Sequence, residues 1–201
     1  MIKAVCFDLD GVYFTKGGMV KFKDAIVGFG ASREKVDYVL HDSPEMAAFK
    51  RGETTENKFW SFACRFWGIK KTKKEIEEVL VRGYEIDKKV DALIKKVRKS
   101  GYKTCVVSNN YSTRIGALEK KFHFLKNFDI VVLSFKVGVT KPDKKIFKIL
   151  LGKAKIKPGE LAYSDDNEEK LGGARELGIQ TFIYNDFNSF TKRLKALGVR
   201  F

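Results

Sequence analysis

The sequence predicts an α/β fold, in which a parallel β-sheet carries helices on both faces and a helical segment follows the first strand. Two observations lead to this prediction. From residue 85 onward, short β-rich apolar runs alternate with segments whose apolar residues recur at helical spacing. Between the first apolar run and the second, only helical patterns occur. Strands that alternate with helices are typical of βαβ units, which build parallel sheets.

Five apolar runs are rich in β-branched or aromatic residues and are expected to form the strands: residues 2–7, 102–107, 129–133, 161–163 and 180–184. The helices between and after them are expected at residues 87–100, 113–122, 144–154, 168–177 and 188–197. Several of these helices end at a glycine, which is a common residue just past a helix C-terminus. The order therefore indicates one doubly wound sheet.

Residues 15–84 are expected to form a small helical module. Several of its segments begin with Ser or Thr and end at Gly, as capped helices do, and Thr72 with Glu75 has the form of a capping box. Because the module lies between the first two strands, it would be an insertion over one end of the sheet. We therefore expect a core domain of residues 1–14 and 85–201 and an inserted helical domain of residues 15–84.

The chain has 201 residues and a formal net charge of +15, which favours acidic ligands such as phosphorylated metabolites or nucleic acid. The lysines are scattered, and no nucleic-acid-binding motif occurs, so nucleic acid is not expected to be the main partner. Cys6, Cys64 and Cys105 are far apart in apolar contexts, which favours reduced thiols and a cytoplasmic location. No apolar stretch approaches membrane-spanning length, and no membrane partner is expected. The pattern leaves the oligomeric state open.

Polar and charged residues gather where the predicted strands end. Ligands of open parallel sheets bind outside the carboxyl ends of the strands, so we looked for chemistry there. The candidate residues are Asp8 and Asp10 in FDLDG, Ser108 and Asn109 in VSNN, Lys141 in GVTKPD, and Asp165 and Asp166 in YSDDN. These residues supply carboxylates, a hydroxyl with backbone amides, and an ammonium group. Such a set suits a metal ion together with a phosphoryl group.

The spacing of Asp8 and Asp10 has a mechanical consequence. Residues two apart in extended backbone point to the same side, so both carboxylates are expected to converge on one small site. Their mutual repulsion would raise a carboxylate pKa unless a cation lies between them. Mg²⁺ fits because it is a hard cation that takes one or two carboxylates plus substrate phosphate. Asp165, from a neighbouring strand, would complete the ligand set.

The motifs FDLDGV, SNN, KPD and SDDN with GARELG resemble, in order, the four motifs of the haloacid dehalogenase-like superfamily. The resemblance covers nearly the whole chain and implies a Rossmann-like core with an inserted helical cap. It implies that Asp8 is the nucleophile and that Asp10 is the general acid and base. By the same resemblance, Ser108, the backbone at Asn109 and Lys141 bind the phosphoryl group. The implied Mg²⁺ ligands are Asp8, the Asp10 carbonyl and Asp165, with Asp166 as a further candidate.

The resemblance implies a Mg²⁺-dependent phosphatase that hydrolyses a small phosphomonoester through an aspartyl-phosphate. Residues 51–60, RGETTENKFW, resemble a cap segment of the branch that contains sugar-phosphate phosphatases and the phosphatase domain joined to epoxide hydrolases. Such a cap would exclude water and contact the leaving group. Two alternatives stay open: a phosphomutase of the same fold, and a basic, nucleic-acid-associated protein whose fold no longer catalyses. The physiological substrate is not specified by these motifs.

Overall fold

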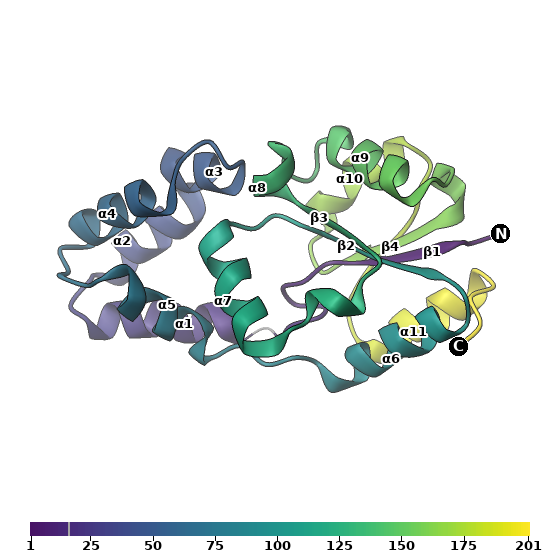
Figure 1. Cartoon of the computed structure of the whole chain (residues 1–201), viewed down its shortest axis with the longest axis horizontal. Helices are drawn as coiled ribbons and strands as arrows, with labels where there is room; N and C mark the ends of the chain where they lie inside the picture. Colours follow the sequence, from purple (N-terminus) through teal and green to yellow (C-terminus); the bar gives the residue numbers. More distant parts are fainter. Residues whose placement is uncertain (16) are drawn as a thin grey trace.

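A five-stranded parallel sheet lies at the centre of the protein, as the computed structural model shows for residues 1–15 and 17–201 (Figure 1). The sheet has the order β3-β2-β1-β4-β5. Its strands are β1 (Ala4–Phe7), β2 (Lys103–Ser108), β3 (Ile130–Leu133), β4 (Leu161–Asp165) and β5 (Gln180–Ile183). In the central strand, Val5 pairs with Thr104 on one side and Ala162 on the other. Because β1 is buried on both faces, it reads as an unbroken apolar run.

Helices cover both faces of this sheet (Figure 1). On one face lie α6 (Lys88–Lys99) and α11 (Phe187–Ala196). On the other lie α9 (Lys144–Ala154) and α10 (Gly172–Glu176). The helix α6 shows how the sequence dictates this packing, because its buried residues recur at helical spacing: Val90, Leu93, Ile94 and Val97. The predicted α/β, Rossmann-like architecture with a parallel sheet is therefore confirmed.

Of the α-helices described between β1 and β2, the first five form a group away from the sheet (Figure 1). They are α1 (Gly18–Gly28), α2 (Arg33–Asp37), α3 (Pro44–Lys50), α4 (Glu56–Trp67) and α5 (Lys73–Arg82), with a π-helical turn at Tyr38–Asp42. We call this group the helical insertion. It has its own apolar cluster, separate from the two that flank the sheet. The capping box predicted at Thr72 and Glu75 is present at the start of α5. The boundaries predicted for the inserted domain, residues 15–84, stay a prediction, and Lys16 lies outside the described residues.

The helical insertion packs against α7 (Ser112–Phe122), which follows β2. Tyr111, just before α7, belongs to the apolar cluster of the insertion. Its ring stacks on Phe49 with 5.0 Å between centroids, and Trp60 Nε1 donates a 3.0 Å hydrogen bond to Thr113 Oγ1. An aromatic contact and a buried hydrogen bond therefore fix the insertion to the carboxyl-end side of the sheet.

The structure differs from the prediction in several short elements. The helices α3 and α8 (Ser134–Val137) were not predicted, because segments of seven and four residues are too short to show a helical period. The helix predicted at residues 168–177 is a 3₁₀ turn at Glu168–Leu171 followed by α10. Consecutive glycines at this junction have low helix propensity. Further 3₁₀ turns occupy Leu125–Asn127 and Pro158–Glu160, and the first strand starts two residues later than predicted.

Within the described ranges 1–15 and 17–201, the helices are all too short or too polar to span a lipid bilayer.

Candidate active site

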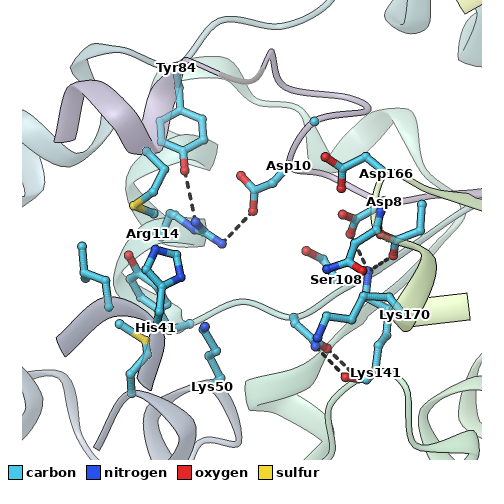
Figure 2. A pocket seen from close by; sticks show the side chains of 18 of the residues that line it. Asp8, Asp10, His41, Lys50, Tyr84, Ser108, Arg114, Lys141, Asp166 and Lys170 are labelled. Atoms are coloured by element: carbon cyan, nitrogen blue, oxygen red, sulfur yellow. Dashed lines mark hydrogen bonds and ion pairs between the residues drawn. The ribbon is translucent and has the colours of Figure 1, made fainter. Parts of the chain in front are cut away.

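A cavity of about 360 Å³ lies at the carboxyl ends of β1, β2 and β4, beneath the helical insertion (Figure 2). Its lining includes every site residue that the sequence predicted: Asp8, Asp10, Ser108, Asn109, Lys141, Asp165 and Asp166. The order β2-β1-β4 explains this meeting, because residues far apart in sequence end on adjacent strands. Their chemical roles stay predictions.

Lys141 links the first and the last of these motifs. It is 3% exposed, and its Nζ donates hydrogen bonds to Asp8 Oδ1 at 2.7 Å and to Asp165 Oδ2 at 2.6 Å. Burial alone would lower the pKa of Lys141, but the two carboxylates raise it above its ordinary value, so the ammonium stays charged. Burial raises the pKa of Asp8 to about 7; Lys141 opposes the shift, and Asp165 and Asp10 add to it.

The loop that carries Lys141 is held from two sides. The side chain of Asn109 donates to the Lys141 carbonyl at 2.9 Å and accepts from the Lys141 backbone N–H at 2.7 Å. On the other side, Gly173 in α10 lies so close that a Cβ there would be 1.9 Å from the Pro142 carbonyl oxygen. A glycine is therefore required at this approach. Together these contacts place the ammonium between the two buried carboxylates.

Three carboxylates form a group that fits a metal ion. One oxygen each from Asp8, Asp165 and Asp166 lies within 4.8 Å of the others. Asp165 is 1% exposed and is oriented by a hydrogen bond from the Tyr163 hydroxyl and another, 3.0 Å long, from the Asn167 backbone N–H. Oxygen donors from carboxylates are those that Mg²⁺ prefers, so the donor set fits this ion.

Asp10 occupies a different position from the one its spacing predicted. The strand ends at Phe7, and a turn with Gly11 at φ 76° follows, so Asp8 and Asp10 are not on one extended segment. Both side chains line the cavity, but the Asp10 carboxylate accepts a 2.7 Å hydrogen bond from Arg114 Nη2 rather than from Lys141. Figure 2 shows this pair away from the Asp8 side of the cavity.

Arg114 is the main site residue that the sequence reasoning missed. It lies in α7 and is 6% exposed, and besides Asp10 it donates to Asn110 Oδ1 at 2.7 Å and to the Tyr84 hydroxyl at 3.1 Å. Burial opposes its charge, but Asp10 and Tyr84 raise the pKa of Arg114 above its ordinary value. A signal was present, because Arg114 shares the apolar face of its helix with Leu118, four residues on. Asn110, which the motif alone suggests as a turn residue, is fully buried and orients this guanidinium.

Ser108 ends β2 at the floor of the cavity and is 1% exposed. Its Oγ accepts a 3.4 Å hydrogen bond from Asn110 Nδ2. Since the side chain of Asn109 is engaged with Lys141, its contribution to a bound anion would come from the backbone.

Comparison with known families gives a match over most of the chain. The family described as haloacid dehalogenase-like hydrolase matches residues 5–184. Bifunctional epoxide hydrolase 2 of Sus scrofa is 32% identical over 109 residues, which is 52% of this chain and 20% of that protein. Acyl-CoA dehydrogenase family member 10 of Mus musculus is 30% identical over 205 residues, which is 97% of this chain and 19% of that protein. The chain thus spans about a fifth of the length of these relatives.

Solved structures share the fold at low sequence identity. A HAD family enzyme from Bacteroides thetaiotaomicron, in complex with magnesium and inorganic phosphate, superposes with a TM-score of 0.78 at 23% identity, covering 94% of this chain and 99% of that one. A HAD phosphatase from Thermococcus onnurineus gives a TM-score of 0.69 at 21% identity, covering 99% of both chains. These likenesses extend over the sheet and the helical insertion together.

Proposed function

Because the chain belongs to the haloacid dehalogenase-like hydrolase family, we propose that it is a Mg²⁺-dependent phosphatase that hydrolyses a small phosphomonoester through an aspartyl-phosphate. The observation that carries the proposal is the Lys141 ammonium, buried between Asp8 and Asp165 beside the three-carboxylate group. The solved relative from B. thetaiotaomicron in complex with magnesium and inorganic phosphate supports the same ligands here.

In the proposed reaction, a carboxylate oxygen of Asp8 attacks phosphorus, and the bond from phosphorus to the leaving oxygen breaks. Asp10 gives a proton to that oxygen and then takes one from the water that releases phosphate from Asp8. Covalent catalysis of this kind divides one difficult step into two easier ones. Arg114 holds the Asp10 carboxylate on the leaving-group side of the cavity throughout.

Binding of the phosphoryl group is proposed for Ser108, the backbone at Asn109 and Lys141. Fixed donors and positive charges stabilise the charge that develops on the phosphoryl oxygens. Asp8, Asp165, Asp166 and the Asp10 carbonyl are the proposed ligands of Mg²⁺. The ion, when bound, would neutralise the charge of the carboxylates and phosphoryl oxygens and so let them approach one another.

The chemistry of Asp10 argues against a second candidate, carbon–halogen cleavage. A halide leaves without a proton, whereas an alkoxide needs one, so a carboxyl group poised beside the cavity favours phosphate-ester chemistry. A phosphomutase would have to return the phosphoryl group from Asp8 to the substrate. None of the residues described above has been assigned that role. We further propose that residues 15–84 act as a cap over a core of residues 1–14 and 85–201, and that the protein acts in the cytoplasm on a phosphorylated metabolite.

The test is hydrolysis of para-nitrophenyl phosphate with and without Mg²⁺ by the wild type, Asp8→Asn and Asp24→Asn. Asp24 is a matched control because its side chain is about half exposed and pairs with Arg33 outside the cavity. We expect Mg²⁺-dependent turnover that Asp8→Asn loses and Asp24→Asn keeps. Turnover retained by Asp8→Asn would overturn the mechanism. A wild type without turnover that binds RNA in a salt-sensitive manner would support the non-catalytic alternative.

A further inference from the structure

Lys50, the last residue of α3, brings a positive charge to the cavity from the helical insertion. Figure 2 shows its ammonium pointing into the cavity, on the side where Arg114 and His41 lie and across from Asp8 and Ser108. The side chain is partly buried. This ammonium therefore faces the space that the leaving group of a phosphomonoester would occupy.

The position of Lys50 is fixed by its neighbours on both sides. Phe49 stacks on Tyr111 from the core and on Phe59 within the insertion, with centroids 5.0 Å and 4.5 Å apart. Gly52 has φ 72°, and a Cβ there would be 2.2 Å from the Phe135 carbonyl oxygen in α8. The turn after Lys50 is thus in backbone contact with the core. The backbone that carries this ammonium is therefore held firmly, which suits Lys50 to orient a ligand.

Two of the other basic groups that line the cavity, Lys141 and Arg114, already have carboxylate partners. Lys141 pairs with Asp8 and Asp165, and Arg114 pairs with Asp10. Among the described residues, the side chain of Lys50 makes no hydrogen bond or ion pair. Burial, followed by the charges of Arg114 and Lys170, lowers the pKa of Lys50 to about 8, and Asp10 opposes this. A bound anion would offset the repulsion from these two cations and so favour the charged form of Lys50.

The remaining lining on this side limits what such an anion can be attached to. Met19, Leu40 and Met46, which belong to the helical insertion as Lys50 does, contribute apolar surface to the cavity. The volume of about 360 Å³ is near the lower end for ligand pockets, which suits a leaving group with a short carbon chain. The cavity thus offers the proposed phosphoryl site at the sheet, with apolar surface and a cation at the insertion.

We propose, on the basis of the proposed phosphatase function, that the substrate is a short phosphomonoester whose leaving group carries a second anionic group, and that Lys50 binds that group. The anion is a carboxylate or a second phosphate, since an ammonium binds either as a point charge. The positive charges of Arg114 and Lys170, which repel the Lys50 ammonium, would also attract the anionic group of the substrate. Lys50 is then a specificity-determining residue of the helical insertion.

The test compares pairs of substrates that differ in one charge. For a carboxylate the pair is 2-phosphoglycolate and 2-hydroxyethyl phosphate; for a phosphate it is 1,3-propanediol bisphosphate and 3-hydroxypropyl phosphate. The measured quantity is the charge preference, the ratio of kcat/KM within a pair, for the wild type, Lys50→Met, Lys50→Arg and Lys58→Met. Lys58 is an exposed lysine of the same insertion outside the cavity.

We expect the wild type to prefer one of the anionic substrates by about 10- to 100-fold, as one charged hydrogen bond provides. Lys50→Met should lose that preference, whereas Lys50→Arg should retain most of it and Lys58→Met all of it. Which pair shows the preference identifies the anion. A wild type without preference, or a preference that survives in folded Lys50→Met, would overturn the assignment of Lys50. Failure of the proposed function itself would look different, because para-nitrophenyl phosphate would then also resist hydrolysis.

Discussion

The ring of Phe49 in the helical insertion stacks on the ring of Tyr111 in the core, with 5.0 Å between centroids and 27° between planes. Tyr111 is 1% exposed and completes an apolar cluster that otherwise consists of insertion residues. The insertion is therefore fixed to the core by a side chain that immediately precedes α7 and follows the proposed phosphate-binding residues Ser108 and Asn109.

Tyr111 should make a large contribution to stability through its ring and little through its hydroxyl. Replacement by Ala removes a buried aromatic ring and should lower the free energy of unfolding by about 3–5 kcal/mol. Replacement by Phe should change it by less than about 1 kcal/mol, because the Tyr111 hydroxyl has no hydrogen-bonding partner in the described part of the chain. Urea denaturation followed by circular dichroism measures both. Equal losses for the two variants would contradict the packing role.

Lys141 should stabilise the metal-free protein because it neutralises two buried carboxylates. Lys141→Met leaves Asp8 and Asp165 without their ammonium and should cost about 3–5 kcal/mol without divalent ions. Added Mg²⁺ should then raise the melting temperature of this variant more than that of the wild type, since the ion supplies the missing charge. Lys145→Met, at an exposed position nearby, is the control. Differential scanning calorimetry in EDTA and in Mg²⁺ measures both effects. A Lys141→Met variant that melts at the wild-type temperature in both conditions would refute this role of Lys141.

Arg114 should affect the step that protonates the leaving group, because it holds Asp10 at 2.7 Å. Alkoxides need that proton more than para-nitrophenolate does. Arg114→Met should therefore reduce kcat for 2-hydroxyethyl phosphate by about 10- to 100-fold, and for para-nitrophenyl phosphate by clearly less. Tyr84→Phe removes just one hydrogen bond of Arg114 and should have a smaller effect of the same kind. Equal losses on both substrates would show that Arg114 does not act through Asp10.

The preference of the enzyme for the anionic member of a substrate pair should depend on pH, because it depends on the charge of Lys50. Its pKa is lowered to about 8, so the group that would bind an anion is protonated below that pH and loses its charge above it. The ratio of kcat/KM for 2-phosphoglycolate to that for 2-hydroxyethyl phosphate should therefore fall as pH rises through about 8. Arg114 stays positive there, because Asp10 and Tyr84 raise its pKa although burial opposes the shift, and His41 is neutral there because burial lowers its pKa.

Assays from pH 6 to 10 with the wild type and Lys50→Met follow this ratio. The variant should give a flat ratio. A wild-type ratio that is also flat, or that rises with pH, would exclude Lys50 as the anion's partner.

Much of this protein could be predicted from the sequence because its chemistry is local to strand ends. The runs at 2–7 and 102–107 are followed at once by Asp8 and Ser108, and parallel pairing brings such ends together whatever the intervening loops do. Arg114 and Lys50 could not be assigned in this way. Their roles depend on how α7 and the helical insertion pack, and each is one basic residue among 40. The partner of Asp10 likewise could not be assigned, because Arg114 comes from a distant helix.

The most direct test of the central claim is to look for phosphate on Asp8. Asp10→Asn should react with para-nitrophenyl phosphate in the presence of Mg²⁺ but release phosphate slowly, because the base for the attacking water is missing. After an acid quench, mass spectrometry of peptides should find one phosphoryl group on Asp8, and hydroxylamine should remove it as expected of an acyl phosphate. Rapid turnover with Asp8 never modified, or phosphate carried by another residue, would contradict the account.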